Sequence, residues 1–256
     1  MKQFNVAILG ATGAVGREML KILEEYDFPV GELRPLASAR SAGSTVPFKG
    51  QEIPVQEARE DSFEGMDFVL GAVGGGMAKQ FAPHIVKAGA VFVDNSSSFR
   101  LDPEVPLIIP EVNGADAFQN KGIISNPNCS TIITLMAVAA INQISPIEKM
   151  VACTYQAVSG AGQAGLVELE NQMEAIARGE EPQRSTFPHQ IACNVIPHIG
   201  DVLDNGYTQE EMKMQNEGQK ILHHPDLKVT CTCVRVPVMR SHSIAVTVKT
   251  AEMFTV

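Results

Sequence analysis

A cysteine stands where a predicted strand gives way to a predicted helix, and it could act as a nucleophile. Cys129 lies in the segment SNPNCSTI, after an Asn-Pro-Asn turn and before a run of small and apolar residues. The N-terminus of a helix favours a thiolate, because its unpaired N–H groups and its dipole stabilise negative charge and lower the pKa of the thiol. Most cysteines are small buried side chains, so this position alone leaves both interpretations open.

The other four cysteines lie in apolar or strand-like segments and are expected to be buried. They are Cys153, Cys193, Cys231 and Cys233. The last two are two residues apart on one predicted strand, so their side chains should share a face. Two ligands at that spacing do not complete a zinc site, and no second Cys or His pair follows at the spacing that such a site needs. Five scattered cysteines are typical of reduced thiols rather than a disulfide framework.

A reactive thiolate needs a partner that handles protons, and one histidine is a candidate. His242 lies between two serines at the start of a predicted strand, and Arg235 lies seven positions before it on the preceding strand. His84, His189 and His198 lie beside prolines in loops or helix starts, where histidines are more often surface residues. From position alone, a structural role for His242 is the commoner outcome.

A glycine-rich turn near the N-terminus could hold the phosphates of a dinucleotide. In GATGAVG, Gly10 permits a tight turn, Gly13 lets the backbone approach a pyrophosphate, and Gly16 permits close packing of helix on strand. The helix that follows offers unpaired N–H groups to the phosphates. The pattern is looser than G-x-G-x-x-G, but its place between the first strand and the first helix favours a dinucleotide site over a turn without a ligand.

The residues after the second predicted strand favour a phosphorylated dinucleotide. An NAD site usually has Asp or Glu here, whereas this chain has Ser38, Ala39, Arg40 and Ser41. An arginine flanked by hydroxyl groups suits a 2′-phosphate. The sequence therefore predicts NADP as the cofactor, and the alternative is that Arg40 is a solvated loop charge.

The first half of the chain alternates short apolar runs with helical patterns, which is typical of βαβ units and a parallel sheet. Continuous Val, Ile and Leu runs fit strands that are covered on both faces. We expect strands at residues 4–10, 32–38, 67–73, 90–97, 106–113 and 121–125, and helices at 14–26 and 78–89.

The second half changes character near residue 127. We expect a long strand at residues 148–160, helices at 165–179 and 208–222 with Thr208 as N-cap, and strands at 227–238 and 241–250 that alternate with period two. Such alternation fits a half-exposed, mainly antiparallel sheet. The chain is therefore predicted to be an α/β protein: a Rossmann-like NADP-binding domain over residues 1–127, then an α+β catalytic and dimerisation domain over residues 128–256.

Composition excludes several classes of function. The chain has 256 residues, 45% of them hydrophobic, and a net charge of -9. A protein that follows a nucleic-acid backbone would carry a basic face, so that class is disfavoured. The sequence contains no run of 18 or more apolar residues, so we expect no membrane-spanning helix. The N-terminus lacks the features of a signal peptide, so we expect a cytoplasmic location.

Taken together, the motifs resemble the aspartate-semialdehyde dehydrogenases of bacterial amino-acid biosynthesis. The segments GATGAVG, LASARSAG, DNSSSFR, SNPNCSTI, TYQAVSGAG, NEGQKIL and RVPVMRSHS occur in that family's order. The resemblance implies reversible, NADP-dependent conversion of L-aspartyl 4-phosphate to L-aspartate 4-semialdehyde, on the route to lysine, threonine, methionine and diaminopimelate. It also implies a small-molecule substrate, phosphate, and a homodimer or dimer of dimers.

The resemblance also implies roles for individual residues. Cys129 would form a thioester, His242 would be the general acid and base, and Gln156 would orient the intermediate. Substrate and phosphate would be bound by Arg100, Asn128, Glu217, Lys220 and Arg235, with Arg235 on the carboxylate, Glu217 on the ammonium, and Arg100 and Lys220 on the phosphate. The cofactor would contact Gly10, Thr12, Gly13, Ala14, Val15, Gly16, Ser38, Arg40, Ser41, Ser159 and Gly160. Because family members continue beyond the equivalent of Val256, the chain is expected to lack their C-terminal part.

Two other readings stay open. One is another cysteine-dependent acyl-phosphate reductase, of the glyceraldehyde-phosphate or acetylglutamyl-phosphate type, although NPNCST and QAVSGAG fit aspartate semialdehyde better. The other is a non-catalytic NADP-binding fragment. A short-chain reductase is excluded, since none of Tyr26, Tyr155 and Tyr207 has a lysine four residues later. A cysteine hydrolase would leave the glycine turn unexplained.

Overall fold

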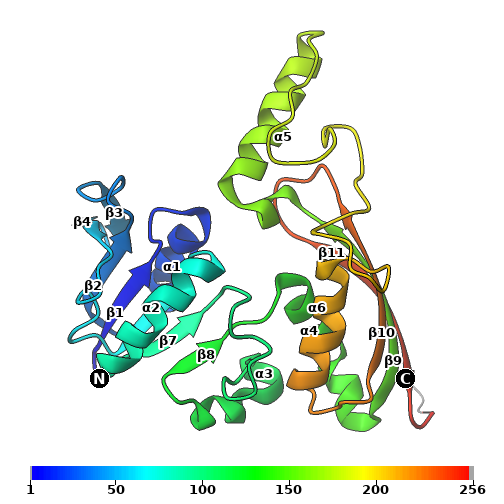
Figure 1. The fold of residues 1–256 in the computed structure, drawn as a ribbon, viewed down its shortest axis with the longest axis horizontal. Helices are drawn as coiled ribbons and strands as arrows, with labels where there is room; N and C mark the ends of the chain where they lie inside the picture. Colours follow the sequence, from blue (N-terminus) through cyan, green and yellow to red (C-terminus); the bar gives the residue numbers. More distant parts are fainter. Residues whose placement is uncertain (1, 254–256) are drawn as a thin grey trace. The chain divides into compact units, whose positions relative to one another are not determined.

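The computed structural model describes residues 2–253 and divides into two compact units, Met1–Pro127 (unit 1) and Asn128–Val256 (unit 2) (Figure 1). Both units combine helices with sheets, as expected for an α/β protein. None of the helices between residues 2 and 253 combines the length and the apolar character that crossing a bilayer requires.

Unit 1 is built on a parallel sheet of six strands among its described residues. The strands are β1 (Phe4–Leu9), β2 (Val30–Ala37), β5 (Gln56–Glu57), β6 (Phe68–Gly71), β7 (Val91–Asp94) and β8 (Ile123–Ser125). Their spatial order is β5-β2-β1-β6-β7-β8, with every neighbouring pair parallel. Numbered along the chain this is the doubly wound order of dinucleotide-binding sheets, which reverses between β1 and β6. The Rossmann-like prediction is confirmed.

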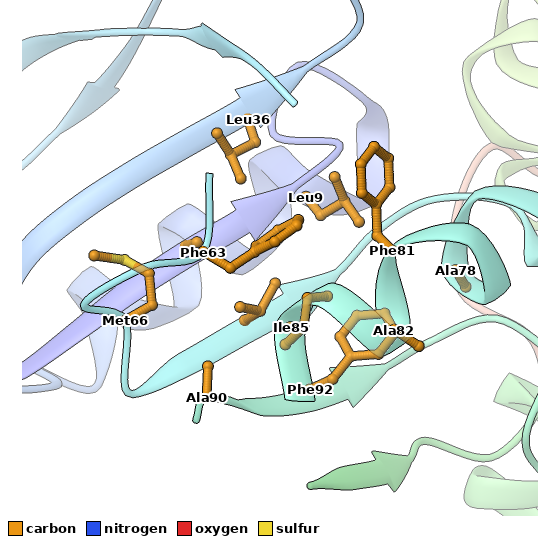
Figure 2. Packing of buried hydrophobic residues seen from close by; sticks show 12 residues of the cluster. Leu9, Leu36, Phe63, Met66, Ala78, Phe81, Ala82, Ile85, Ala90 and Phe92 are labelled. Carbon is orange, nitrogen blue, oxygen red and sulfur yellow. The ribbon is translucent and has the colours of Figure 1, made fainter. Parts of the chain in front are cut away.

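Both faces of this sheet are covered, because successive side chains of a strand point to opposite sides. Ala7 and Leu9 of β1 pack in a cluster with residues of helix α2 (Gly75–Lys87). Figure 2 shows that cluster, in which the rings of Phe63 and Phe81 meet edge to face at 5.6 Å. Val6 and Ile8 face the other way, toward helix α1 (Ala14–Glu25) and the ribbon of β3 (Thr45–Phe48) and β4 (Gln51–Pro54). The continuous apolar runs therefore reflect burial on both faces.

The predicted strand at residues 106–113 is wrong. Only Leu107 pairs with Ser125, as an isolated bridge, and the chain then enters helix α3 (Pro110–Asn113) and the 3₁₀ helix η1 (Gly114–Gln119). The Asn113 side chain accepts the N–H of Ile109 and donates to the carbonyl of Leu107, both over 2.9 Å. These bonds occupy backbone groups that a strand would use for pairing. A short helix that begins at Pro110 therefore forms in place of the predicted strand.

Unit 2 holds a mixed sheet of three strands among its described residues. β9 (Ile147–Gln156) lies between β10 (Lys228–Arg235), which is parallel to it, and β11 (Ser243–Thr250), which is antiparallel. The expected mainly antiparallel sheet is thus half parallel. A long connection through η2 (Val158–Ala161), α5 (Gly162–Ala177) and α6 (Gln209–Ile221) lets β10 return in the direction of β9, as parallel pairing requires.

Two helices cover one face of this sheet and leave the other exposed. Helix α4 (Cys129–Ile144) contacts β9 and β11, and α6 contacts β10 and α4 (Figure 1). Val151 and Tyr155 of β9 point to the uncovered face, where they are 52% and 46% exposed. Helix α6 begins at the predicted cap: Thr208 accepts the N–H of Glu211, and Glu211 accepts the N–H of Thr208. The period-two alternation is confirmed as that of a half-exposed sheet.

Candidate active site

Cys129 is the first residue of helix α4, and the preceding turn caps that helix. The Asn128 side-chain oxygen accepts the N–H of Ser130 over 3.0 Å and the N–H of Thr131 over 3.2 Å. These are two of the donors that a helix start leaves unpaired. The thiol therefore lies at the helix N-terminus, as the sequence predicts, with its residue partly open to solvent.

The structure brings Cys129 and His242 together from positions 113 residues apart. Cys129 Sγ lies 3.2 Å from His242 Nε2. On the other side of the ring, Nδ1 accepts the backbone N–H of Ala157 over 3.0 Å. Helix α4, the turn after β9 and the residue before β11 thus meet at one thiol–imidazole pair. Such a pair has the geometry needed for covalent catalysis.

The surroundings shift the pKa of each member of this pair in the direction that favours its neutral form. Burial raises the pKa of the Cys129 thiol, and the carboxylate of Glu210 raises it further, while the N–H of Ser130 at the helix N-terminus opposes both. The helix N-terminus therefore lowers the pKa of the thiol as expected, but burial outweighs this effect. Burial lowers the pKa of His242, and the Arg235 cation lowers it further.

Glu210 ties the surroundings of Cys129 together, although the sequence did not single it out. Its Oε1 accepts Asn128 Nδ2 over 2.9 Å and Gln156 Nε2 over 3.2 Å, and its Oε2 pairs with Lys213 Nζ at 2.7 Å. Burial raises the pKa of the Glu210 carboxyl, but Lys213 and the hydrogen bonds outweigh it and hold that pKa low. Gln156, at the end of β9, is buried and held in this network.

Glu217 and Lys220, to which the resemblance gives the ammonium and the phosphate, lie further along α6 than Glu210. Glu217 is buried, and its Oε2 accepts the backbone N–H of Asn128 over 2.7 Å. Lys220 follows it toward the C-terminal end of α6. Because Glu210 and Glu217 are seven residues apart, they share one helix face. Glu210 and Lys213 have the same i,i+3 spacing as Glu217 and Lys220. This spacing is the sequence signal that could have identified Glu210 and Lys213.

Arg235 places a cation beside the thiol–imidazole pair. It ends β10, its side chain is buried, and Nη1 donates to the carbonyl of Ala157 over 2.7 Å. The Phe187 ring lies 5.9 Å from the guanidinium. A Cβ on Gly160 would come within 2.8 Å of Arg235 Nη1 and 3.5 Å of His242 Cε1. A side chain at position 160 would therefore touch the imidazole at an ordinary distance and displace the Arg235 guanidinium.

The neighbouring Ser159 is fixed by its backbone. It belongs to the 3₁₀ helix η2, and its N–H donates to the carbonyl of Met239 over 3.2 Å. The preceding N–H, of Val158, donates to Val238 over 2.9 Å. The segment Ala157–Gly160 is thus held against the chain that leads from β10 to His242.

In unit 1, the glycine turn lies where the strand order of the sheet reverses. Gly10 has φ +92, and a Cβ there would come within 2.4 Å of the Ala72 carbonyl oxygen, in the turn after β6. A Cβ on Gly16 would come within 2.3 Å of the Gly10 carbonyl oxygen. Gly13 is the N-cap of α1 and has no side chain to cap it, so the first N–H groups of α1, those of Ala14 and Val15 included, face the turn. Backbone and helix start therefore fit a pyrophosphate.

Two other parts of unit 1 belong to the expected set. The turn after β2 holds Ser38, Arg40 and Ser41, with the Ser41 N–H donating to Ser38 over 2.9 Å and the Arg40 residue exposed. The carbonyl of Thr12 in the glycine turn accepts Arg17 Nε over 3.2 Å. An exposed cation flanked by hydroxyl groups fits a 2′-phosphate.

Arg100 lies at the carboxyl ends of two strands in unit 1. Its Nε donates to the carbonyl of Asn126, after β8, and its Nη2 donates to the carbonyl of Asn95, after β7, both over 2.9 Å. The side chain is buried. Ligands of open parallel sheets bind at this edge, which is consistent with the phosphate contact that the resemblance implies.

The other cysteines follow the predictions in part. Cys231 and Cys233 are buried on one face of β10, with their sulfur atoms 3.6 Å apart. Cys153 is half-buried, and Cys193 is exposed, so the expected burial of Cys193 is wrong. Cys193 lies in a loop with φ 57, where an apolar neighbourhood in the sequence did not become core. Among residues 2–253, no three His, Cys, Asp or Glu side chains gather as metal ligands would.

Comparison with known families matches both units. Residues 5–120 match the model described as "Semialdehyde dehydrogenase, NAD binding domain", and residues 138–256 match "Semialdehyde dehydrogenase, dimerisation domain". The chain is 48% identical to the aspartate-semialdehyde dehydrogenase of Synechocystis sp. over 251 residues, which cover 98% of this chain and 74% of that relative. It is 49% identical to the Bacillus subtilis protein of the same name over 249 residues, 94% of this chain and 72% of that one.

Solved structures show the same similarity. A structure of aspartate semialdehyde dehydrogenase II from Vibrio cholerae, complexed with ASA, matches with a TM-score of 0.97 and 47% identity over 99% of this chain and 76% of that chain. The Francisella tularensis enzyme matches with a TM-score of 0.82 and 27% identity over 99% and 78%. These relatives are longer, but the comparisons give no support to the expected loss of a C-terminal part. The end of the chain at Val256 lies outside the described residues.

Proposed function

This chain belongs to the aspartate-semialdehyde dehydrogenase family, and on that premise we propose that it interconverts L-aspartyl 4-phosphate and L-aspartate 4-semialdehyde with NADP as cofactor. The proposed setting is the biosynthesis of lysine, threonine, methionine and diaminopimelate in the cytoplasm. The observation that carries the chemistry is the 3.2 Å contact between Cys129 Sγ and His242 Nε2 at the start of α4.

In the biosynthetic direction, Cys129 attacks the acyl carbon of the phosphorylated substrate as a thiolate. Phosphate leaves and a thioester remains, which divides one difficult step into two easier ones. His242 Nε2 lies 3.2 Å from the sulfur, and its proposed role is to exchange a proton with the oxygen that develops charge on the neighbouring carbon. Gln156 is held by Glu210 and Thr154 and cannot titrate, so its proposed role is to position the intermediate.

Charged side chains of unit 2 are proposed to bind the two ends of the amino-acid substrate. Arg235 takes the carboxylate, because a guanidinium can bind it through two parallel hydrogen bonds. We assign the ammonium group to Glu210 in place of Glu217, since Glu210 is the carboxylate that contacts Asn128 and Gln156 side chains. Glu217 keeps a supporting role through the backbone of Asn128.

Phosphate is proposed to bind to cationic and amide side chains. The resemblance implies Arg100, Lys220 and the Asn128 side chain. Lys213 joins this set, because it lies on the same helix face as Glu210 and is held by that carboxylate at 2.7 Å. A separate cation is required for each anionic group of the substrate, since one guanidinium cannot serve both ends.

The residues of unit 1 fit a nicotinamide dinucleotide at the glycine turn. Gly10, Thr12, Gly13, Ala14, Val15 and Gly16 would surround the pyrophosphate, and Ser38, Arg40 and Ser41 would take the 2′-phosphate that distinguishes NADP from NAD. Ser159 and Gly160 are proposed to lie near the nicotinamide. When bound, the dinucleotide supplies the hydride for reduction and accepts it in the reverse direction.

Unit 2 is proposed to pair with a second copy of the chain. It matches a dimerisation-domain model, and its sheet leaves one face uncovered, with Val151 and Tyr155 about half exposed. A second copy packed on this face would bury these side chains. A homodimer, or a dimer of such dimers, is therefore the proposed assembly.

The test is reduction of NADP in the presence of L-aspartate 4-semialdehyde and phosphate. Turnover should require phosphate and should disappear in Cys129→Ala, while NADP binding is retained. Cys193→Ala is the matched control, because it removes an exposed thiol that has no proposed role, and it should stay active. Full activity of Cys129→Ala would refute the mechanism. Turnover with glyceraldehyde 3-phosphate or acetylglutamate semialdehyde instead would favour the rival reductases, and NADP binding without any turnover would favour a binding protein.

A further inference from the structure

We propose that Asn205 is a site of spontaneous deamidation, and that its conversion to isoaspartate loosens the start of helix α6. The chain has two Asn-Gly pairs, Asn113-Gly114 and Asn205-Gly206. The backbone nitrogen after an asparagine can attack the side-chain amide, and a following glycine hinders this attack least because it has no Cβ. The structure protects the first asparagine and leaves the second exposed. This inference does not depend on the proposed function.

Asn205 lies at the tip of a tight turn that joins Leu203 to Tyr207. The N–H of Leu203 donates to the Tyr207 carbonyl over 2.7 Å, and the N–H of Gly206 donates to the Leu203 carbonyl over 2.9 Å. Gly206 has φ +82, which a residue with a side chain rarely adopts. Asn205 and Gly206 are both exposed, so water reaches the amide.

The Asn205 side chain is turned toward the backbone that follows it. Its Oδ1 accepts the N–H of Tyr207 over 3.1 Å, which is the hydrogen bond of an Asx-turn. This bond draws electrons from the side-chain carbonyl carbon, and the ring that it closes contains both that carbon and the Gly206 nitrogen. Nδ2 contacts the Met212 sulfur at 3.5 Å, and a thioether is a weak acceptor. The group that must leave is therefore held only weakly.

Asn113 is fixed by three side-chain hydrogen bonds. Its Oδ1 accepts the N–H of Ile109, and its Nδ2 donates to the Leu107 carbonyl and to Asp116, all over 2.9 Å. Asn113 ends helix α3, and Gly114 begins the 3₁₀ helix η1. Attack on this amide would break the three bonds and unwind the junction of the two helices. The same Asn-Gly sequence is therefore protected here.

The reaction at Asn205 needs only water as co-reactant. Once the bond from Gly206 to Leu203 opens, the Gly206 nitrogen loses its proton to solvent and forms a bond to Cγ of Asn205. The Cγ–Nδ2 bond breaks, Nδ2 takes up a proton and leaves as ammonia, and a succinimide ring remains. Water then opens the ring. Opening at Cγ gives aspartate, whereas opening at the backbone carbonyl gives isoaspartate, whose main chain runs through Cγ and is longer by a methylene group.

Isoaspartate changes the segment that leads into α6. Val202 pairs with Thr208 across the turn, and a longer main chain at position 205 shifts this pairing. Thr208 is the N-cap of α6, and Glu210 in the first turn of that helix accepts the side-chain amide of Asn128. Deamidation therefore acts on a helix start that supports the candidate active site.

The first experiment compares the two Asn-Gly pairs in one sample. The full chain is incubated for several weeks in warm, mildly alkaline buffer, and its tryptic peptides are sequenced by mass spectrometry. Asn205 should deamidate roughly tenfold faster than Asn113 or more, because fewer hydrogen bonds must open. In concentrated urea the two rates should become similar, since the fold no longer protects Asn113. Equal rates in the folded chain, or an unchanged Asn205, would overturn the proposal.

The second experiment tests the effect on α6. Isoaspartate is measured by methyl transfer from S-adenosylmethionine with an isoaspartyl methyltransferase, and the label should accumulate in the aged parent chain but not in aged Asn205→Gln. The aged parent should unfold at a lower urea concentration than the fresh chain. Fresh Asn205→Asp should match the fresh parent, because it carries the new charge without the longer main chain. An equal loss of stability in Asn205→Asp, or none in the aged parent, would contradict the loosening by isoaspartate.

Discussion

Glu217 Oε2 accepts the backbone N–H of Asn128 over 2.7 Å, so a carboxylate of α6 holds the residue that caps α4. Glu210, two turns earlier on α6, accepts the side-chain amide of the same Asn128. Two carboxylates from one helix face therefore fix the turn before Cys129. Glu210 also accepts the side-chain amide of Gln156, so we expect the two carboxylates to serve different purposes.

Glu217 should contribute mainly to stability. Glu217→Ala leaves the buried N–H of Asn128 without this acceptor, and we expect the free energy of unfolding to fall by about 2–3 kcal/mol. Urea denaturation measures the loss. Glu148→Ala is the control, because it removes only an exposed ion pair with Lys249 and should cost less than about 1 kcal/mol. Equal losses in the two variants would contradict the supporting role of Glu217.

Glu210 and Lys213 should shift the reactivity of Cys129 in opposite directions. Glu210 raises the pKa of the thiol and Lys213 lowers it, after the larger effect of burial. Glu210→Gln should therefore move the alkylation profile of Cys129 to lower pH, and Lys213→Met should move it to higher pH, each by about half a unit to one unit. Rates with iodoacetamide across pH give both midpoints, and shifts of the same sign would exclude this electrostatic account.

Arg40 should decide the preference between NADP and NAD. Arg40→Ala removes the cation proposed for the 2′-phosphate, so the Kd for NADP should rise about 10–100-fold while that for NAD stays unchanged. Titration calorimetry with each dinucleotide measures the two constants. Arg59→Ala serves as the matched control, because Arg59 is exposed and paired with Glu57. If affinity for both dinucleotides falls alike, Arg40 is not reading the 2′-phosphate.

The stability of unit 2 should depend on the ionisation of Glu168. This buried carboxylate on α5 accepts the Ser185 N–H over 3.1 Å and the Ser185 hydroxyl over 2.9 Å, and it also accepts the N–H of Thr186. Burial raises the pKa of Glu168, but these bonds outweigh it and hold the pKa below its ordinary value. They anchor the loop that carries Phe187 to Arg235.

A carboxyl whose folded pKa is lowered stabilises the folded state above its unfolded pKa, and that contribution is lost as the pH falls through the folded value. The unfolding free energies of the parent chain and of Glu168→Gln should therefore differ by about 1–3 kcal/mol near neutral pH. The gap should narrow below about pH 4, near the unfolded pKa of a glutamate. Urea titrations at several pH values test this, and a gap independent of pH would rule it out.

Local features of this protein were predictable because they depend on residues that are close in the chain. The glycine turn places three glycines between a strand and a helix, and the capping pair Thr208 and Glu211 stands three residues apart. Cys129 follows directly from the Asn-Pro-Asn turn that caps its helix. Residues 106–113 show where local prediction fails. This apolar run was predicted to be a strand, but its end forms the short helix α3, because Pro110 starts a helix and the Asn113 side chain takes hydrogen bonds that a strand would need.

The sequence by itself determined the two-part α/β organisation, the turn at Gly10 and the helix start at Cys129. Only the tertiary structure decided that β10 runs parallel to β9, that Nδ1 of His242 meets Ala157, and that burial raises the pKa of the thiol. It also shows that Glu210 contacts the Gln156 side chain, whereas Glu217, on the same helix face, accepts the backbone N–H of Asn128. The periodicity of a sequence predicts which face of a helix is buried. Packing between distant segments determines which residue on that face contacts the residues around Cys129.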